Sequence, residues 1–319
     1  GLLVGRINIG LGLVGVLLMG GGFGGGLILR GLCGPLVGFC LRLAVGGLPH
    51  GLAGVIDGVG RVVRGLLGGG DLVGRAGRIL CGLLLGACTQ RQTTLKFMSY
   101  NIRNGRGIDN VQDLGRVAEI INRTAPDIVA LQELDSVTGR MAGRFIPGEL
   151  GEMTGMHARF CRAIDYDGGA YGVGLLSRDE PLAVRRIPLP GREESRVLFV
   201  AEFPDYVVCV THLSLTPEDQ RASLPIIRTV TDTCRKPVLL AGDFNMKVAK
   251  TVLDGLGGAF RPLSDTTQMT FPSDKPSIRI DYILGRGLPE SAVVTERQVD
   301  TSTVASDHCP LWVSLAWKK

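Results

Sequence analysis

The chain has 319 residues, enough for one large domain or two small ones, and its composition is uneven along its length. Residues 1–95 carry eight arginines against two aspartates, which leaves 27 of the 35 basic and 28 of the 30 acidic side chains for residues 96–319. The pI of 8.8 therefore reflects the N-terminal segment and gives no support for a basic, nucleic-acid-binding face on the rest. None of the eight cysteines forms a CxxC pair, which argues against structural zinc.

Residues 1–72 are rich in glycine and leucine, and 24 of the 47 glycines fall within residues 1–70. Residues 7–29 are uncharged, and a stretch of that length is long enough to span a bilayer. Nine of these 23 residues are glycine, which weakens any helix. Two interpretations remain open: a membrane segment, or weakly ordered or artefactual sequence.

Residues 73–94 contain a pattern typical of a bacterial signal peptide. Arg75 and Arg78 precede an apolar stretch over residues 79–87, and small residues follow. The sequence LGAC at residues 85–88 resembles the lipobox of bacterial lipoproteins, in which the cysteine becomes the lipidated N-terminus. This interpretation predicts translation from near Val73 and an extracytoplasmic, membrane-anchored protein. The alternative is one more apolar stretch without a targeting role.

From Leu95 onward the sequence is typical of a globular domain, predicted to cover residues 95–319. Apolar runs bounded by Pro, Gly, Asp or Asn predict strands. Residues 196–203 and 206–212 are separated only by Pro204 and Asp205, which predicts an antiparallel hairpin. The predicted strands are 95–102, 127–133, 196–203, 206–212, 237–243, 278–284 and 310–317.

Two helices are predicted between these strands. Asp109 or Asn110 caps the first, in which apolar residues from Val111 to Ile121 recur at helical spacing until Pro126 ends it. The second begins at Pro217 and runs to about residue 233. Strand–helix alternation mixed with hairpins predicts an α/β sandwich with sheets inside and helices outside.

Polar side chains stand at the ends of these predicted strands. Each alone is a good turn former, and a single one would carry no functional meaning. Six such endings in one domain are harder to explain by turns, because loops at strand ends of α/β folds face a common crevice. The endings are Asn101, Glu133, His212, Asp243 with Asn245, Asp281, and Asp307 with His308.

This set of side chains has a defined chemistry. Carboxylate and amide oxygens without cysteine suit a hard cation, Mg²⁺ or alternatively Mn²⁺. Histidines beside carboxylates suit general acid–base work near neutral pH. The marks of a nucleophilic serine, a P-loop and an HExxH zinc site are missing from the sequence. Metal-assisted attack of water on a phosphoester fits best.

The sequence resembles the endonuclease/exonuclease/phosphatase superfamily, whose fold is similar to pancreatic deoxyribonuclease. The matching stretches, in order from Ser99 to Pro310, are SYNIRNG, LQELD, GAYGVGLLSR, VTHL, GDFN, RIDYIL and SDHCP. The resemblance implies a four-layer α/β/β/α sandwich with two mixed, mainly antiparallel sheets inside. It also implies a metal-dependent phosphoric ester hydrolase.

The resemblance carries roles over to individual residues. It implies that Asn101 and Glu133 hold the metal, with Asp307 in support. Asp243 would orient and deprotonate the attacking water, and Asn245 would contact the phosphate.

The remaining roles concern the phosphoryl group. The resemblance implies that His308, paired with Asp281, binds a phosphoryl oxygen or transfers a proton. Tyr171 and His212 would stabilise charge on the phosphorane. Arg178 would add a substrate contact, although an arginine at a strand end is more often part of an ion pair.

The details of the motifs narrow the branch but not the substrate. The VTHL stretch is similar to nuclease, sphingomyelinase and phosphatase branches, and Arg103 stands where abasic-site endonucleases usually carry Asp. The sequence looks most similar to small bacterial secreted members, which are related to proteins of GPI-lipid remodelling. Phospholipid, small phosphodiester and nucleic-acid substrates remain open, as does a non-catalytic, membrane-anchored binding protein. We expect a monomer.

Overall fold

The computed structural model describes residues 2–9, 12–19, 26–33, 37–44 and 92–318. The chain divides into two compact units, Gly1–Thr89 and Gln90–Lys319. The described part of the first unit is an antiparallel sheet in the order β1 (Leu2–Ile9), β2 (Gly12–Met19), β3 (Gly26–Cys33) and β4 (Val37–Ala44).

The described residues test the predictions for the N-terminal segment only in part. Where residues 7–29 are described, they lie in strands, and among the described residues no helix has the length and hydropathy to cross a membrane. The signal and lipobox prediction over residues 73–94 lies outside the described residues, except that residues 92–94 open the first strand of the second unit.

The second unit contains two six-stranded sheets. Each has one parallel pair, β5–β6 in the first and β11–β12 in the second, and otherwise antiparallel neighbours. The first sheet has the order β15 (Val293–Val299), β16 (Leu311–Lys318), β5 (Gln92–Asn101), β6 (Ile128–Ser136), β8 (Gly169–Ser177), β7 (His157–Tyr166). The second has the order β13 (Arg261–Pro262), β14 (Asp281–Arg286), β12 (Val238–Asp243), β11 (Val207–His212), β10 (Arg196–Glu202), β9 (Ala183–Leu189).

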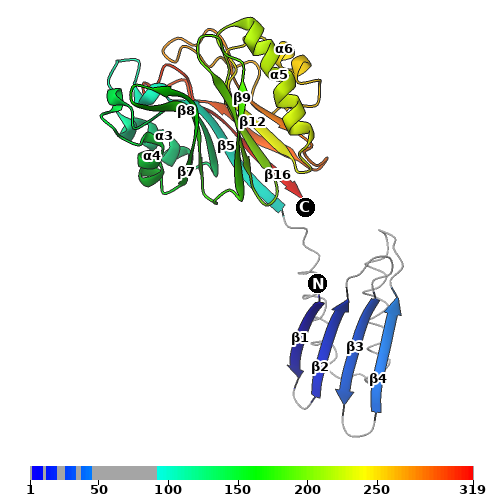
Figure 1. The fold of residues 1–319 in the computed structure, drawn as a ribbon. Helices are drawn as coiled ribbons and strands as arrows, with labels where there is room; N and C mark the ends of the chain where they lie inside the picture. Colours follow the sequence, from blue (N-terminus) through cyan, green and yellow to red (C-terminus); the bar gives the residue numbers. More distant parts are fainter. Residues whose placement is uncertain (1, 10–11, 20–25, 34–36, 45–91, 319) are drawn as a thin grey trace. The chain divides into compact units, whose positions relative to one another are not determined.

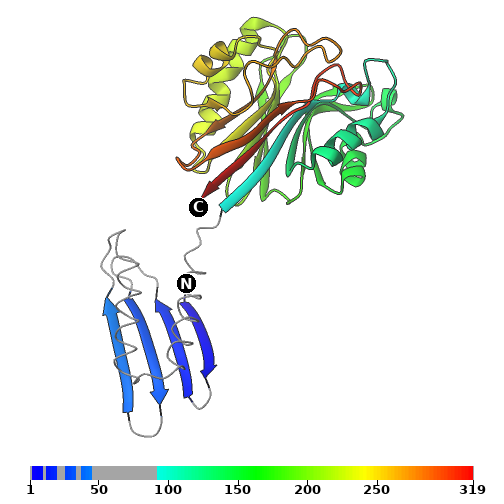
Figure 2. The ribbon, with the colours of Figure 1, turned by 180° about the vertical axis from the view of Figure 1, so that it is seen from behind.

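Helices cover the outer face of each sheet. Helices α3 (Leu114–Thr124) and α4 (Ile146–Thr154) lie on one side, and α5 (Pro217–Asp232) and α6 (Ala249–Gly255) lie on the other (Figure 1). The view from behind shows the same sequence of layers (Figure 2). Short 3₁₀ turns at Arg103–Gly105 and Gly139–Met141 shape two loops. The predicted four-layer α/β/β/α sandwich is confirmed.

Three buried apolar clusters hold the layers together. One lies between the sheets and includes Phe97, Val210 and Ile283. A second joins the first sheet to α3 and α4, and a third joins the second sheet to α5 and α6. Buried apolar area is the main source of stability here, because each fully buried aliphatic or aromatic side chain contributes about 1.5–3 kcal/mol. The rigid core leaves loops at the strand ends free to carry function.

Local predictions succeeded where the sequence pattern was strong and failed at element starts. The hairpin β10–β11 and the helix beginning at Pro217 are confirmed. The first helix was predicted to begin too early: Val111 precedes it and is exposed, and Asp113 rather than Asp109 or Asn110 is its N-cap, accepting a hydrogen bond from Gly115 N.

Candidate active site

Three candidate side chains lie on adjacent strands of the second sheet at the same level. His212 ends β11 and pairs in register with Asp243 of the parallel strand β12. Asp243 pairs in turn with Asp281, which opens the antiparallel strand β14. All three are buried, and His212 Nε2 lies 3.5 Å from Asp243 Oδ2. Strand register therefore places three titratable side chains that are distant in sequence in one row across the sheet.

The turn after β12 depends on its glycine. Gly242 has a φ of 150°, and a Cβ there would lie 1.9 Å from Thr211 O on the neighbouring strand. Only glycine permits that approach. Asn245 follows with a φ of 51°, and its backbone N–H donates to Asp243 Oδ1 over 2.8 Å. This bond fixes the direction in which the Asp243 carboxylate points.

The first sheet contributes Asn101, Glu133 and Tyr171. Glu133 sits at a register shift in β6 with a φ of 58°, a β-bulge that breaks the alternation of the strand. Asn101 ends β5, and its Nδ2 donates to Glu133 Oε1 at 3.0 Å and to Asp243 Oδ2 at 3.2 Å. Asn101 thus connects the polar groups of the two sheets.

His308 completes the cluster from the loop before β16. Its Nδ1 lies 3.0 Å from Asp281 Oδ2, and its Nε2 lies 3.7 Å from Asp243 Oδ2. Ser306 holds this loop in place, because its hydroxyl donates to Asn101 O at 2.7 Å and accepts from His308 N at 3.2 Å. The Phe271 ring packs 4.8 Å from the imidazole. The histidine is therefore fixed in position and orientation.

Burial and mutual charge shift the protonation of this cluster. Burial raises the pKa of Asp243 to about 7, and the neighbouring Asp281 carboxylate adds to the rise. Burial alone would lower the pKa of His308, but the carboxylates of Asp281 and Asp243 outweigh it and raise that pKa to about 10. Burial, with Arg196 and His308 nearby, holds the pKa of His212 well below its usual range. Near neutral pH the site therefore combines a protonated and a neutral histidine.

Asp307 and the Asn245 side chain lie at the border of the cluster. The Asp307 carboxylate is half-buried, and its Oδ2 lies 3.4 Å from Arg103 Nε. Asn245 Nδ2 donates to Leu213 O at 2.9 Å, which ties the turn after β12 to the loop after β11. The predicted roles of Asp307 in metal binding and of Asn245 in phosphate contact stay predictions.

Arg178 is the one predicted site residue that the fold does not bring to the cluster. It follows β8, pairs with Asp127 just before β6 begins, and is exposed. Asp127 lies six residues before Glu133, which corresponds to about 20 Å along an extended strand. Because β8 runs antiparallel to β6, Arg178 lies at the opposite end of these strands from Glu133. The predicted role of Arg178 in substrate binding stays a prediction.

No sequence pattern pointed to Arg196, which the structure places beside the cluster. It begins β10, its side chain is 6% exposed, and its Nη1 lies 2.8 Å from Glu194 Oε1. Arg196 lines a narrow space together with Tyr171 and His212, and its Nε has no hydrogen-bond partner among the described residues. Arg196 therefore places a buried cation, paired with a carboxylate, beside Tyr171 and His212. Only the pairing of β10 with β11 reveals it.

Comparison with known proteins identifies the family. The family model described as "Endonuclease/Exonuclease/phosphatase family" matches residues 98–308. The chain belongs to this family. The match includes the positions from Asn101 to His308 that form the cluster, and the family comprises phosphoester hydrolases of nuclease and phosphatase type.

Solved structures share the fold at low identity. A family protein from Bacteroides thetaiotaomicron is 18% identical, with 72% of this chain and 97% of that chain covered and a TM-score of 0.59. A mannosyl-6-phosphatase from the same organism is 18% identical, with 69% and 99% covered and a TM-score of 0.57. D. rerio TDP2 in complex with a single-strand DNA product is 17% identical, with 70% and 99% covered and a TM-score of 0.55.

Endonuclease/exonuclease/phosphatase enzymes generally use a divalent metal, and the donor set here fits one. Burial raises the pKa of Glu133, and among the described residues no lysine or arginine forms an ion pair with its carboxylate. A hard cation would neutralise that charge. Asp243, Asp281 and His308 also bring one ligand-capable atom each within 4.8 Å of one another, and Asp281 Oδ1 is buried without a hydrogen-bond partner.

Asn101 would need one adjustment to bind a cation. Its Nδ2 faces Glu133 and Asp243, and its Oδ1 accepts from Arg103 N at 3.1 Å. An amide nitrogen donates protons and does not bind metal, so the amide would turn over to present its oxygen.

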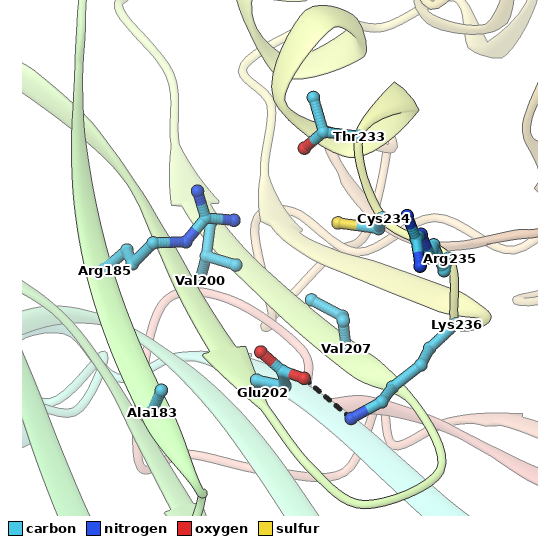
Figure 3. Close-up of a pocket in the computed structure, with 9 residues that line it drawn as sticks. All are labelled: Ala183, Arg185, Val200, Glu202, Val207, Thr233, Cys234, Arg235 and Lys236. Atoms are coloured by element: carbon cyan, nitrogen blue, oxygen red, sulfur yellow. Dashed lines mark hydrogen bonds and ion pairs between the residues drawn. The ribbon is translucent and has the colours of Figure 1, made fainter.

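A cavity larger than the space lined by Arg196 lies elsewhere among the described residues. It has a volume of about 340 Å³ and is lined by residues including Arg185, Glu202, Cys234 and Lys236 (Figure 3). These residues belong to the beginning of β9, the end of β10 and the turn before β12, which lie at the opposite end of the strands from His212 and Asp243. This cavity and the candidate active site therefore lie at opposite ends of the second sheet.

Proposed function

We propose that this protein is a Mg²⁺-dependent phosphodiesterase that cleaves a phosphoester bond by attack of water. The observation that carries the proposal is the convergence of Asp243, Asp281, His212 and His308 at one point where the two sheets meet. Two acidic groups and two histidines in different protonation states provide a base and an acid side by side.

Asp243 is the proposed general base. Its Oδ1 is held by the Asn245 backbone N–H, while Oδ2 is shared by Asn101 Nδ2 and the two imidazoles. Asp243 takes a proton from water as the water oxygen forms a bond to phosphorus. A base with a pKa of about 7 is well matched to work near neutral pH.

His308 is the proposed proton donor and phosphoryl ligand. Asp281 holds Nδ1, which leaves Nε2 to donate toward a phosphoryl oxygen or the departing alcohol oxygen. As the bond between phosphorus and the leaving oxygen breaks, that oxygen takes a proton and leaves as an alcohol. Tyr171 and His212 add hydrogen-bond donors, and Arg196 adds fixed positive charge nearby.

The divalent ion would be held by Glu133 and Asn101 with support from Asp307. When bound, it supplies positive charge that stabilises a phosphoryl oxygen and the leaving oxygen. The protein groups around it orient the substrate, exclude bulk water and move the proton.

A metal-dependent assay on a phosphodiester panel tests the proposal. The panel is bis-p-nitrophenyl phosphate, sphingomyelin, phosphoinositides, and single- and double-stranded DNA, each with Mg²⁺, with Mn²⁺ and with chelator. We expect hydrolysis of at least one substrate, and losses of at least about 10²-fold in Asp243→Ala and in His308→Ala.

Two results would contradict this proposal. If the folded protein cuts none of these substrates with either metal, a non-catalytic binding protein is the better description. If a substrate is cut but both variants match the wild type, the roles proposed for Asp243 and His308 are wrong. Glu202→Gln at the distant cavity is the matched control for removing an acidic group, and we expect it to keep wild-type activity.

We also propose that the protein is extracytoplasmic and lipid-anchored at Cys88. The support is the charged, apolar and small-residue pattern of residues 75–88. Metabolic labelling with palmitate tests it, with Cys88→Ser as the variant. Equal labelling of Cys88→Ser and wild type would contradict the anchor.

A further inference from the structure

Exposed apolar side chains gather around the candidate active site. We call the loops next to the cluster the site edge: residues 102–113, 137–145, 166–168, 190–195, 213–216, 244–248, 263–280 and 300–310. The second unit has twelve exposed large apolar side chains among its described residues, and eight of them lie on this edge. They are Val111, Val137, Phe145, Tyr166, Leu215, Val248, Met269 and Val304.

These eight residues, which we call the apolar rim, lie on the loops of the site edge or, for Tyr166, at the end of β7, and hydrogen bonds join several of these segments. Gly107 N donates to Val111 O and Ile108 N donates to Val304 O, so the loops of Val111 and Val304 are neighbours. Ser136 pairs with Phe145 across the base of another loop. The apolar rim is therefore set on a braced framework.

Leu215 and Val248 are fastened in the same way. Gln220 is buried on α5, and its Nε2 donates both to Ser214 O and to Asn245 O, one in each loop. Leu215 is 67% exposed and Val248 is 58% exposed, although a rigid base supports both loops. Their exposure therefore reflects the fold.

Scattered exposed apolar residues are normal, but a concentration around one site marks a contact surface. The rim contributes little to the stability of the free protein, because its side chains remain in water. Here the apolar side chains surround a candidate phosphoester-cleaving site. A matching partner would have a wide surface that carries phosphoesters above an apolar layer.

We propose that the apolar rim docks on a phospholipid surface, so that the site meets the headgroup phosphoester of a membrane lipid. This inference rests on the proposed function for its substrate, but the docking itself does not. The apolar side chains would enter the region between headgroups and acyl chains, as the apolar faces of peripheral membrane proteins do.

Charge and side-chain type favour lipid over nucleic acid. Residues 96–319 have 27 basic and 28 acidic side chains, so this part of the chain lacks the excess of positive charge that binding to a polyanion needs. Six of the eight rim residues are aliphatic or Met, and only Phe145 and Tyr166 offer rings on which bases stack. A nearly neutral protein with an aliphatic rim matches a zwitterionic headgroup layer such as phosphatidylcholine.

A tryptophan placed on the rim tests docking without any catalysis. Val248→Trp carries the probe, and Val293→Trp is the matched control, because Val293 is 57% exposed but begins β15 at the other end of the strands. Both are made in the full chain and mixed with phosphatidylcholine vesicles containing brominated acyl chains. The quenching of the wild type, which has two native tryptophans, is subtracted from each.

We expect the Val248→Trp emission to shift to shorter wavelength and to be quenched at least about twofold more than that of Val293→Trp. Quenching that is equal in the two variants, or absent from both, overturns the proposal. Because the probe reports depth at its own position, membrane binding through residues 1–91 alone would give the equal result.

A pair of double variants tests the link to substrate. Leu215→Ser with Val248→Ser removes rim contacts, and Leu182→Ser with Val293→Ser removes side chains of similar exposure far from the site. Loss of two apolar anchors should reduce vesicle phospholipid hydrolysis about tenfold relative to the control. Hydrolysis of soluble bis-p-nitrophenyl phosphate should stay within about twofold in both.

The outcomes separate this inference from the proposed function. Equal vesicle hydrolysis by the two double variants overturns the role of the apolar rim in reaching lipid while leaving the hydrolase in place. If no phosphoester is cut but Val248→Trp is selectively quenched, the proposed function fails and the docking surface stands. Rim-dependent binding of single-stranded DNA without vesicle quenching would assign the rim to nucleic acid and overturn the proposal.

Discussion

The two ends of the central strands differ in whether their charged side chains are buried or exposed. At the site edge, Asp243, Asp281 and His308 are buried within a few ångströms of one another, and burial and mutual charge shift the pKa values of Asp243 and His308. At the opposite end, the Glu202–Lys236 pair borders the larger cavity, and Glu202 is exposed to solvent. The candidate site therefore keeps together charges that are costly to bury, whereas the pair beside the larger cavity stays in contact with solvent.

The largest difference between the two ends should be the stability lost when a glycine with positive φ is replaced by alanine. Gly242→Ala places a Cβ 1.9 Å from Thr211 O in the row of His212 and Asp243. We expect a loss of about 4 kcal/mol in the free energy of unfolding, or about 12 °C in Tm. Gly287→Ala, with φ of 62° but no nearer atom than 4.0 Å, should cost about 1 kcal/mol. Thermal unfolding of both variants measures the difference, and equal Tm values would refute it.

Removing the partner of the site histidine should have the next largest effect. Asp281→Asn leaves His308 without the carboxylate that holds its Nδ1 at 3.0 Å. We expect kcat on bis-p-nitrophenyl phosphate to fall about 10²-fold, or about 2.7 kcal/mol of barrier, with KM within about threefold. The control Glu202→Gln should keep both constants. A rise in KM with unchanged kcat would show that Asp281 acts in binding instead.

A smaller difference in activity is expected between variants of Arg196, beside the candidate site, and Arg178, at the opposite end. Arg196→Met removes a buried cation beside Tyr171 and His212, and we expect about a tenfold loss of kcat/KM. Arg178→Ala removes an exposed partner of Asp127 at the far edge and should change kcat/KM less than about twofold. Steady-state kinetics on one soluble substrate distinguishes them. A larger loss of kcat/KM in Arg178→Ala would support the prediction that Arg178 contacts the substrate.

The smallest difference between the two ends should be in how the stability contributed by a glutamate depends on pH. The Glu193 side chain loses some solvation, but hydrogen bonds from Ser214 and Leu215 N and the charge of Arg196 lower its pKa to about 2. Its contribution is present above the ordinary pKa of about 4.5 and is lost as pH falls toward 2. After discounting for partial exposure, we expect about 1 kcal/mol, or about 3 °C in Tm.

Thermal unfolding at pH 7 and pH 3 checks this prediction. The Tm difference between wild type and Glu193→Gln should be present at pH 7 and reduced at pH 3. Lys236 also lowers the pKa of Glu202, but Glu202 is exposed to solvent, so Glu202→Gln at the opposite end should show a smaller pH-dependent difference. A difference for Glu193→Gln that is the same at both pH values would contradict the assignment.

Strong local patterns made much of the fold predictable. The hairpin β10–β11 and the strand ending in Asp243 follow from apolar runs between turn residues, which act over a few residues. Strands β7, β9 and β15 carry exposed or mixed faces, and periodicity alone predicted none of them. Strand β8 is mostly buried, but its three glycines are unfavourable in strands and weaken its pattern. The helix N-cap was misplaced because Asp109, Asn110 and Asp113 are all good capping residues, and only the backbone path selects Asp113.

The sequence by itself determined which side chains were available: the acids, amides and histidines at strand ends, in an order that resembles one family. Tertiary structure decided which of them meet. Register places His212, Asp243 and Asp281 in one row, a bulge at Glu133 breaks the alternation of β6, and antiparallel pairing sends Arg178 away. It also brings in Arg196 and the apolar rim, because distances across sheets and between loops depend on contacts far apart in sequence, which local patterns do not encode.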